Sequence, residues 1–444
     1  MAVLTADTAS AIDEAVTSGA EHAFCFLEQL VAAPSVLGDE CPAQELVLTE
    51  FARLGFSMKR VPIRDDVALE PTAGIPRIPY EGRYSVAGRR GTFGRPSLLL
   101  NGHIDVAPTG DMRFWDSNPF TPLRKNGWLV GRGAGDMKAG LAMAALAVAA
   151  LSTAYPQGLE GPLSLVSVIE EECTGNGTLA TMRAGYLADA VIVLEPTDLK
   201  LALGGIGVLW LDIEVEGLAG HVDLSGQVVN ALEAAMPVIT ALSDLEDRLN
   251  AGQRPRGGPS RFAVNIGTIH GGDWPSSVPS VLSLGVRMGF PSAWSVGEAE
   301  QQLRDAVDAA CANNPWLKHH PPVIRQAGLR AAGYRVGETD PFVQAFVATH
   351  TVTHGSPPGV VYPAWTTDAR FYVNLMGCPA ICYGPRSKNL HGANEGVELA
   401  SVIEGARTLA RFIAEWPANL SQAGRENGRR ATEASFTPAE RECP

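Results

Sequence analysis

Histidine and acidic side chains stand at the ends of apolar runs that this sequence predicts as strands. His103 and Asp105 close the run LLLNGHID, in which positions i and i+2 of an extended chain share one face. Glu195 ends a second run, DAVIVLE. Because open parallel sheets place their ligands at the carboxyl ends of their strands, we expect these side chains to meet. Taken alone, so short a His-x-Asp motif is better explained as a surface turn.

Three further segments favour a functional site over a surface turn. VIEEECTGNGT puts Glu170, Glu171 and Glu172 at the end of a buried strand, where adjacent like charges are costly unless a cation compensates them. A solvated acidic loop is the competing interpretation. GRGAGDMKAG carries Asp136 just before an Ala-rich helix, and SKNLHGANEG carries His391 in a loop. Two histidines and several carboxylates in such positions form the ligand set of a two-zinc hydrolase.

Composition narrows the class of protein. A chain of 444 residues is long enough for two or three domains. Its formal net charge of -13 argues against binding to nucleic acid or to an anionic membrane. Seven scattered cysteines without a CxxC pair favour a reducing compartment, and the N-terminus lacks the basic and apolar regions of a signal peptide. The apolar run 140–151 is too short to span a bilayer, so we expect a buried helix in a cytoplasmic protein.

Secondary-structure patterns divide the chain into units. Over 1–206 and again over 331–416, strands alternate with helices and predict an α/β fold with a largely parallel sheet. Between them, 207–330 follows the β-α-β-β-α-β order of a ferredoxin-like unit, which looks like an insertion. The segment 64–96 is rich in Pro, Gly and Arg and is predicted to be a loop or hairpin insertion. Residues 417–444 are predicted to form a loose polar tail.

Six motifs together resemble a known family. GHIDVAP, GRGAGDMKAG, EEECTGNGT, LEPT, GLAGHVD and LHGANE match, in order and separation, the motifs of the M20 metallopeptidases, which include acetylornithine deacetylase, succinyl-diaminopimelate desuccinylase and glutamate carboxypeptidase. The resemblance covers residues 20–415 or so. It implies a zinc-exopeptidase-type mixed sheet flanked by helices, formed by 1–206 and 331–416. It also implies that 207–330 is an inserted ferredoxin-like lid or dimerisation domain.

The resemblance assigns a role to each candidate ligand. His103 and Glu195 would bind one zinc ion, Glu172 and His391 would bind the other, and Asp136 would bridge both. A cis peptide follows the bridging aspartate in this family. Co2+ and Mn2+ are candidate substitutes for the two Zn2+ ions.

The resemblance also names the groups around the metals. Asp105 would orient His103, and Glu171 would be the general base. Glu170 takes the leading position, where the family commonly has Asp. Because three glutamates are adjacent, an error of one residue would exchange the roles of Glu171 and Glu172.

Two candidates lie in the inserted unit. The family places a histidine matching His221 in the active site of the partner subunit, where it stabilises the tetrahedral oxyanion. By its own context His221 could equally be a helix-capping or surface residue. Arg287 matches an arginine that holds a substrate carboxylate, although an arginine on an exposed strand face has an equal claim.

These residues predict a metal-dependent hydrolase of amide bonds. We expect a homodimer, joined through 207–330, that deacylates a small N-acyl amino acid or a related N-acyl amine. Dipeptidase or carboxypeptidase activity, or deformylation of an N-formyl aminopyrimidine, is the alternative within the family. A metal-binding scaffold without catalysis and a cysteine hydrolase that uses Cys173 are the alternatives from other classes.

Overall fold

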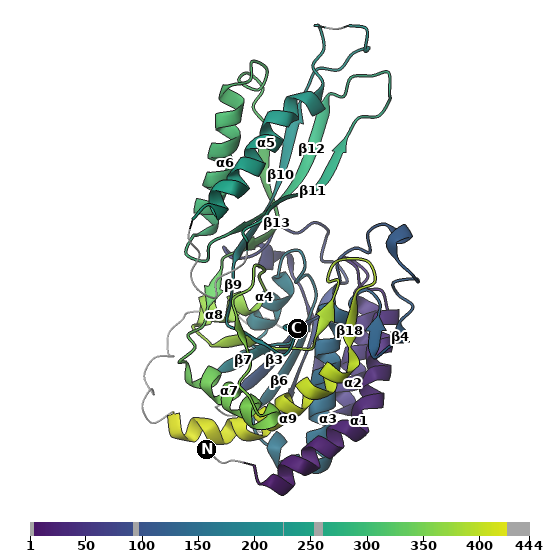
Figure 1. Cartoon of the computed structure of the whole chain (residues 1–444), viewed down its shortest axis with the longest axis vertical. Helices are drawn as coiled ribbons and strands as arrows, with labels where there is room; N and C mark the ends of the chain where they lie inside the picture. The colour runs from purple at the N-terminus through teal and green to yellow at the C-terminus, as the bar shows by residue number, and fades with distance from the viewer. Residues whose placement is uncertain (1–3, 92–96, 225, 253–260, 424–444) are drawn as a thin grey trace, which may run out of the picture.

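The computed structural model describes residues 4–91, 97–224, 226–252 and 261–423 and shows two layered units (Figure 1). The larger unit is built on an eight-stranded mixed sheet with the order β1-β2-β6-β3-β7-β16-β8-β15. Strands β6, β3, β7 and β16 run parallel to one another, whereas β2, β8 and β15 run in the opposite direction. The strands are β1 (Ser57–Pro62), β2 (Tyr84–Arg90), β3 (Leu98–His103), β6 (Leu163–Val168), β7 (Ala190–Val193), β8 (Leu201–Ala202), β15 (Val360–Val361) and β16 (Ala380–Cys382).

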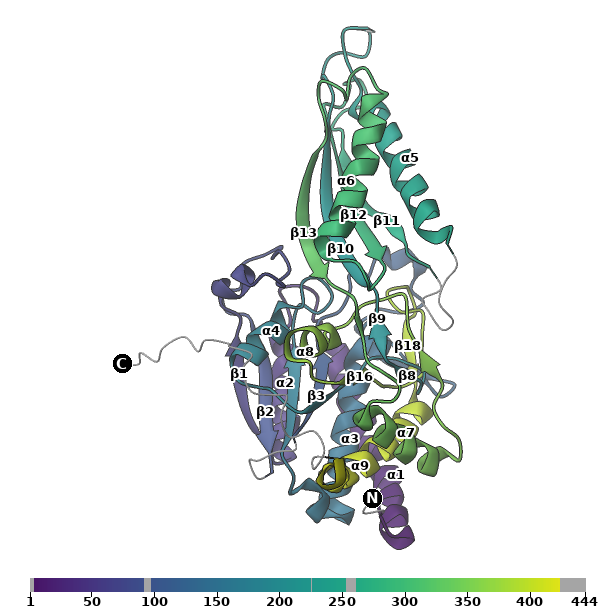
Figure 2. The same cartoon turned by 90° about the vertical axis from the view of Figure 1, so that its left-hand side faces the viewer.

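Helices cover both faces of this sheet (Figures 1 and 2). On one face, Asn101 of β3 donates hydrogen bonds to Thr178 of α4 (3.1 Å) and Tyr372 of α8 (3.0 Å). On the other face, a Cβ at Gly102 would meet Leu141 of α3, and α1, α2 and α9 pack with α3. The helices are α1 (Ala6–Ala32), α2 (Cys41–Arg53), α3 (Ala139–Ala154), α4 (Asn176–Arg183), α7 (Pro341–His354), α8 (Ala369–Met376) and α9 (Leu399–Ala423).

Helix α3 lies at the centre of the larger core. Its small side chains allow a close approach, since a Cβ at Gly140 would stand 2.0 Å from the carbonyl oxygen of Leu194. Among the described residues, the stretch Ala134–Ala154 is long and apolar enough to cross a membrane by length and composition alone, but 78% of its most apolar window is buried inside the protein. The expected buried helix is therefore confirmed.

The second unit stands at one end of the larger one and has its own core (Figures 1 and 2). Its four strands are antiparallel, in the order β11-β12-β10-β13, and the element order is the expected β-α-β-β-α-β. Leu209, Leu211 and Ile213 of β10 face helices α5 and α6, whereas Trp210 and Asp212 alternate with them on the open face. The elements are β10 (Gly207–Glu216), α5 (Ala231–Asn250), β11 (Val264–Gly271), β12 (Val281–Phe290), α6 (Val296–Ala312) and β13 (Val323–Ala331).

Three details of the larger unit differ from or refine the expectations. The sheet is mixed, as the family resemblance implied, and less parallel than the alternation of strands and helices suggested. Segment 64–96 is more than the expected loop or hairpin insertion, because it contains β2, which pairs with β1 on one side and with β6 on the other as a strand of the central sheet. Helix α9 continues to Ala423, past the predicted start of the tail, because Phe412, Ile413 and Trp416 anchor its preceding turns in the core. The rest of the predicted tail, 424–444, lies outside the described residues.

Candidate active site

Three neighbouring parallel strands end at one edge of the large sheet. His103 is the last residue of β3, the acidic run Glu170–Glu172 follows β6, and Glu195 follows β7. Because β6, β3 and β7 are adjacent and parallel, the sheet topology alone brings these side chains to one place.

His103 is held in one orientation by its surroundings. It is 1% exposed, and its Nδ1 lies 2.8 Å from the backbone carbonyl oxygen of Asp105. A carbonyl oxygen can only accept, so Nδ1 carries a proton, and Nε2 faces the carboxylates. With Nδ1 engaged in this way, Nε2 is the nitrogen that could bind a metal ion.

The other half of the site comes from two loops. Asp136 lies in the turn Ala134–Lys138 before α3, and the peptide bond from Asp136 to Met137 is cis, as expected. His391 lies between β17 (Ser387–Lys388) and β18 (Gly396–Glu398). These strands belong to a small sheet of order β17-β18-β5-β4, with β4 (Leu123–Lys125) and β5 (Trp128–Val130).

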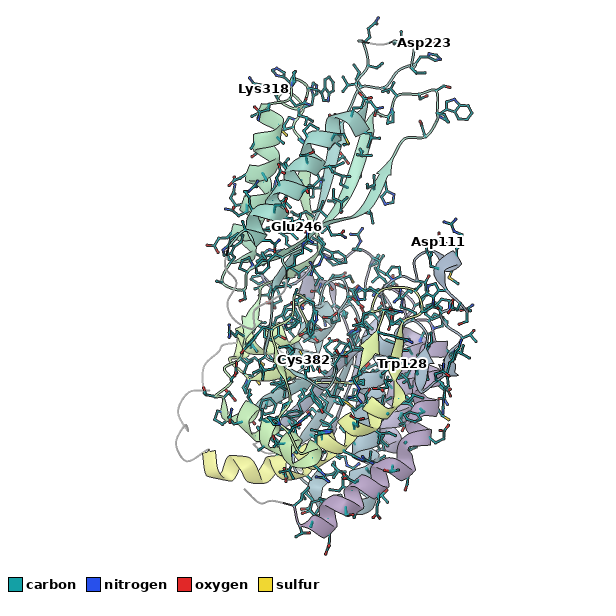
Figure 3. All side chains as sticks on the ribbon, in the orientation of Figure 1. Asp111, Trp128, Asp223, Glu246, Lys318 and Cys382 are labelled. Carbon is teal, nitrogen blue, oxygen red and sulfur yellow. The ribbon has the colours of Figure 1, made fainter. Side chains whose placement is uncertain are left out.

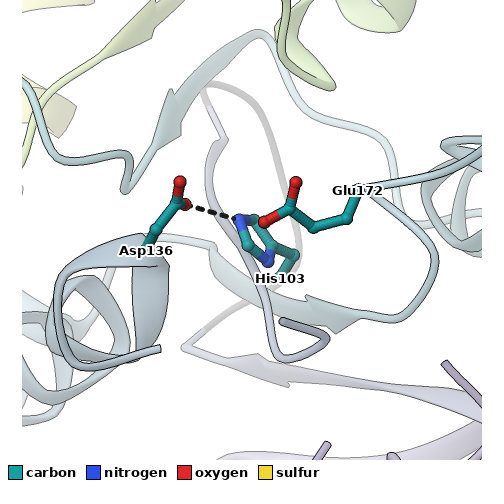
Figure 4. Close-up of side chains that lie close together, drawn as sticks. All are labelled: His103, Asp136 and Glu172. Carbon is teal, nitrogen blue, oxygen red and sulfur yellow. Dashed lines mark hydrogen bonds and ion pairs between the residues drawn. The ribbon is translucent and has the colours of Figure 1, made fainter. Parts of the chain in front are cut away.

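Asp136 lies between the two histidines. Its Oδ1 is 3.1 Å from His103 Nε2, and its Oδ2 is 3.4 Å from His391 Nε2. On the outer sides, Glu195 Oε2 is 3.9 Å from His103 Nε2 and Glu172 Oε1 is 3.0 Å from His391 Nε2. Ligand atoms of His103, Asp136 and Glu172 lie within 4.8 Å of one another (Figure 4). The chain thus offers two adjacent groups of candidate metal ligands, with the carboxylate of Asp136 between them.

The three consecutive glutamates have different surroundings. Glu170 turns away from the cluster and accepts hydrogen bonds from Tyr80 (3.0 Å) and from the buried Arg83 (2.5 Å). Glu172 faces the histidine of the small-sheet loop. Glu171 is buried, and its carboxylate makes no hydrogen bond within the described part of the chain. The loop therefore presents two glutamates to the site and uses the first one as an anchor.

The carboxylate of Asp105 contacts a different group from the one that we expected. We expected its side chain to orient His103, but the backbone carbonyl does so, and the nearest carboxylate oxygen is 3.7 Å from the ring. The carboxylate instead accepts the backbone N–H groups of Glu171 (3.3 Å) and Glu172 (3.1 Å). Asp105 thereby connects the end of β3 to the loop that carries both glutamates.

Burial and crowding perturb the acids of this cluster. Burial raises the pKa of Glu171 well above its usual range, that of Glu195 to about 8, and that of Asp105 to about 7. These shifts arise because several carboxylates share one buried space and cannot all be charged without compensation. Bound cations would supply that compensation.

The pKa values of the two histidines are also raised, in their case by the negative charges around them. The negative charge of Glu172 and the hydrogen bond with Asp136 raise the pKa of His391 to about 11. Burial alone would lower the pKa of His103, but its hydrogen bond to Asp136 and the charge of Glu195 outweigh burial and raise it. Imidazole nitrogens and carboxylate oxygens are the ligands that Zn2+ prefers, so the donor set fits a metal centre.

A comparison with models of protein families shows to which family this chain belongs. Residues 99–415 match the model of peptidase family M20/M25/M40. The chain belongs to this family. Membership makes it a hydrolase that acts on amide bonds.

Two relatives with assigned names illustrate what this chain is similar to. The chain is 29% identical over 359 residues to N-formyl-4-amino-5-aminomethyl-2-methylpyrimidine deformylase of Bacillus subtilis, covering 76% of this chain and 84% of the relative. It is 29% identical over 395 residues to succinyl-diaminopimelate desuccinylase of Methylobacillus flagellatus, covering 86% and 95%. Among solved structures, the di-peptidase Dug1p of Saccharomyces cerevisiae superposes with a TM-score of 0.77 at 15% identity, covering 93% of this chain and 99% of that one, and so shares the M20 fold.

The M20 fold of this chain keeps His221 away from the cluster. His221 lies in a loop at the far end of the inserted unit, next to Asp223, which Figure 3 labels at the top of the molecule. Its side chain is 62% exposed, and its Nδ1 is 3.3 Å from the carboxylate of Asp223. Within one chain, therefore, the structure does not bring His221 to the other candidate residues.

Arg287 is placed on the open face of the inserted sheet. It pairs across β10 with Trp210 and across β11 with Asn265, opposite the face that carries the helices. It makes no hydrogen bond or ion pair to another described residue, and burial lowers its pKa. A half-buried arginine without a partner among the described residues is available to an anionic ligand, and this role is taken up below as a proposal.

Sequence reasoning missed several buried charges around the site. Arg132 and Glu395 form an ion pair beneath Asp136, and Asp368 pairs with Arg370 at 3.2 Å. Arg132 and Glu395 lie inside the quoted motifs GRGAGDMKAG and LHGANE, which was their only sequence signal, whereas Asp368 and Arg370 lie in none of the quoted motifs. Ion pairing between segments 263 residues apart cannot be derived from either segment alone.

Proposed function

We propose that this M20 chain is a dinuclear zinc-dependent amidohydrolase that removes the acyl group from a small N-acyl amino acid or a related N-acyl amine. The observation that carries this proposal is Asp136, which offers one carboxylate oxygen to each of two histidine-centred groups. His103 and Glu195 complete one group, and His391 and Glu172 complete the other. Co2+ and Mn2+ accept the same kinds of ligand and are expected substitutes.

Two ions in these positions would polarise an amide carbonyl and lower the pKa of a water molecule. In our proposal, Glu171 takes the proton of that water and delivers it to the leaving nitrogen. It is suited to this because it is buried beside the cluster and its carboxylate is not engaged in a hydrogen bond within the described chain. Such acid–base help contributes about 10²–10⁴ in rate. Asp105 holds the backbone N–H of Glu171 and so fixes its position.

The substrate class is argued from chemistry and from the relatives. Both named relatives at 29% identity remove a formyl or succinyl group from an amine, which favours an N-acyl substrate over a peptide. Arg287 would hold a carboxylate of that substrate. Dipeptidase or carboxypeptidase activity and deformylation of an N-formyl aminopyrimidine are the alternatives within the family.

A partner subunit completes the site in this proposal. We propose a homodimer joined through 207–330, in which His221 of one chain stabilises the oxyanion formed at the cluster of the other. Three observations support it. His221 is exposed at the far end of its own unit, Val222, Leu224 and Trp274 expose apolar surface beside it, and β11 is a free edge strand.

Two alternatives of other classes make different predictions. Burial raises the pKa of the Cys173 thiol well above its usual value, which disfavours the thiolate that a cysteine hydrolase needs. A scaffold without catalysis would bind metal and turn nothing over. The six cysteines within the described residues are free thiols, which suits the cytoplasmic location that we also propose.

The test is a turnover screen of the zinc-loaded protein. N-formyl, N-acetyl and N-succinyl amines are compared with dipeptides, each with and without a chelator. We expect hydrolysis of at least one N-acyl amine, its loss on chelation, its recovery with Zn2+, and no loss with a thiol reagent. Bound metal without turnover of any substrate would favour the scaffold, and resistance to chelation would exclude the proposed mechanism.

A further inference from the structure

A buried ion pair lies directly beneath the ligand cluster. Arg132 Nη1 is 2.5 Å from Glu395 Oε2, and both side chains are 1% exposed. Buried pairs of this kind often contribute little net stability, because the cost of removing two charges from water offsets their attraction. Their presence here therefore requires an explanation other than the stability of the core.

Glu395 holds the backbone that carries the shared carboxylate. Its Oε1 accepts the backbone N–H groups of Gly135 and Asp136, both at 2.9 Å. Hydrogen bonds from N–H groups to a charged carboxylate are among the stronger ones in proteins. The turn before α3 is thus fixed at the residue whose side chain lies between the two histidines.

Arg132 holds two other loops with its second arm. Its Nη2 donates hydrogen bonds to the carbonyl oxygens of Pro108 (3.0 Å) and His391 (3.1 Å). The guanidinium also lies 5.3 Å from the centre of the Trp115 ring. His391 depends on such support, because its own side chain is 55% exposed and no strand holds its backbone.

The pair therefore connects both loop-borne ligands, whereas His103 has separate support from β3 and Asp105. We propose that Arg132 and Glu395 are positioning residues that set the distance between Asp136 and His391 and so control binding of the second metal ion. This inference rests on the proposed dinuclear site. Substitutions in groups that orient metal ligands typically cost about 10–100-fold in metal affinity.

The experiment measures metal binding to the apoprotein by titration with Zn2+ against a competing chelator. Glu395→Gln keeps the size but weakens the hold on two N–H groups, and Arg132→Lys keeps the charge but removes the arm that reaches His391. For both variants we expect the ion held by His391 to be bound about 10–100-fold more weakly. The ion held by His103 should lose less affinity, because it shares only Asp136 and keeps the support of β3 and Asp105. Asp13→Asn is the matched control, because Asp13 pairs with Arg411 at 2.7 Å between α1 and α9.

Thermal unfolding of the apoproteins separates positioning from folding. The proposal holds if the second affinity falls while Glu395→Gln or Arg132→Lys unfolds within a few degrees of Asp13→Asn. It is overturned if both affinities stay within twofold of the wild type, if both fall equally, or if neither variant folds. A wild-type protein that binds fewer than two ions would instead refute the proposed dinuclear site.

Discussion

The two places in this chain where a histidine carries a candidate role are built in opposite ways. His103 is buried at the end of a central strand, and its two ring nitrogens face a backbone carbonyl and two carboxylates. His221 stands in the outermost loops, which we call the tip (residues 217–224 and 271–281), with Asp223 as its polar neighbour (Figure 3). The first environment is complete within one chain. His221 can donate a hydrogen bond, but within the described part of one chain it lies away from the other candidate catalytic residues.

The two regions also differ in whether their apolar side chains are buried or exposed. Around the cluster, strands β3, β6 and β7 are buried throughout. At the tip, Trp274 is 68% exposed, and Val222 and Leu224 are also exposed. Contiguous exposed apolar residues mark contact sites on soluble proteins. The contrast supports the proposal made above: the candidate ligands gather within one chain, whereas the exposed tip would pack against a second surface, as an active site shared between subunits requires.

The largest expected effect concerns the proposed general base beside the ligand cluster. Glu171→Gln removes the proposed base but no proposed ligand, so we expect turnover to fall by about 10²–10⁴ with both metal ions retained. Glu170→Gln is the matched control. It breaks the buried contact with Arg83, which keeps its second buried partner Glu40, so we expect the free energy of unfolding to fall by less than the roughly 3–5 kcal/mol of a buried charge left wholly unpaired. Kinetics, metal analysis and urea unfolding measure the three quantities.

An opposite pattern would correct the assignment of the glutamates. If Glu172→Ala retained two zinc ions while Glu171→Ala lost one, the ligand and the base would have to be exchanged. The structure favours the present assignment, because Glu172 and not Glu171 lies 3.0 Å from His391.

The second effect tests whether the tip acts on another chain. His221→Ala should lower turnover by about 10²–10³, the usual loss for one oxyanion donor, and leave metal content unchanged. Equal amounts of Glu171→Ala and His221→Ala, allowed to exchange subunits, should regain about one quarter of wild-type activity, since half of the dimers carry one intact site. Exchange shown by a tag, with no recovered activity, would exclude the shared site.

Much of the cluster was predictable because sheet topology dictates it. His103 and Glu195 end apolar runs, and parallel neighbouring strands must end at the same edge, so their meeting follows from the pattern alone. Asp136 and His391 lie in loops, and only the resemblance to M20 enzymes related them to that edge. Their contacts depend on backbone hydrogen bonds, such as those of Arg132 and Glu395, for which no periodic pattern exists.

Asp105 shows what residue spacing cannot predict, even within a single short motif. Spacing i, i+2 correctly placed it beside His103, yet the orienting atom is its carbonyl oxygen. The side chain reaches the loop after β6, 66 residues away in sequence. Spacing determines which face a residue occupies, but the partner on that face depends on the neighbouring strand and its loop.

The third effect follows from that position. Asp105→Asn places an amide group against one of two backbone N–H groups, which repels a donor with a donor, and the loop of Glu171 and Glu172 should shift. We expect about 10–100-fold weaker binding of zinc, measured against a competing chelator, at constant apoprotein stability within about 1 kcal/mol. Asp223→Asn beside His221 is the control at the tip. Equal effects of the two substitutions on zinc affinity would contradict the contrast between the regions.

The smallest expected effect concerns a buried lysine of the larger unit, compared with an exposed lysine of the inserted unit. Lys138 is fully buried, and its Nζ donates hydrogen bonds to the carbonyl oxygens of Leu30 (2.7 Å) and Ala33 (3.1 Å) at the end of α1. Burial lowers its pKa to about 7, although the charges of Glu395 and Asp105 oppose this. An unfolded lysine titrates near pH 10.4, so between these values the unfolded chain binds more protons than the folded one. The contribution of Lys138 to the free energy of unfolding therefore rises with pH in this window, by at most about 1.4 kcal/mol per pH unit.

Lys138→Met removes this dependence while it keeps most of the volume. Urea unfolding of the metal-free proteins between pH 7.5 and 9.5 (roughly the middle of the titration window) measures the difference between wild type and variant. We expect that difference to move in favour of the wild type as pH rises, because the folded wild type then no longer has to bury a charge. Lys318→Met, exposed at the outer end of the inserted unit (Figure 3), is the control and should leave the difference flat. A flat difference for Lys138→Met as well would show that Lys138 keeps its charge in the core, held by the two carbonyls and Glu395, and the buried region would then tolerate positive charge as readily as the exposed one.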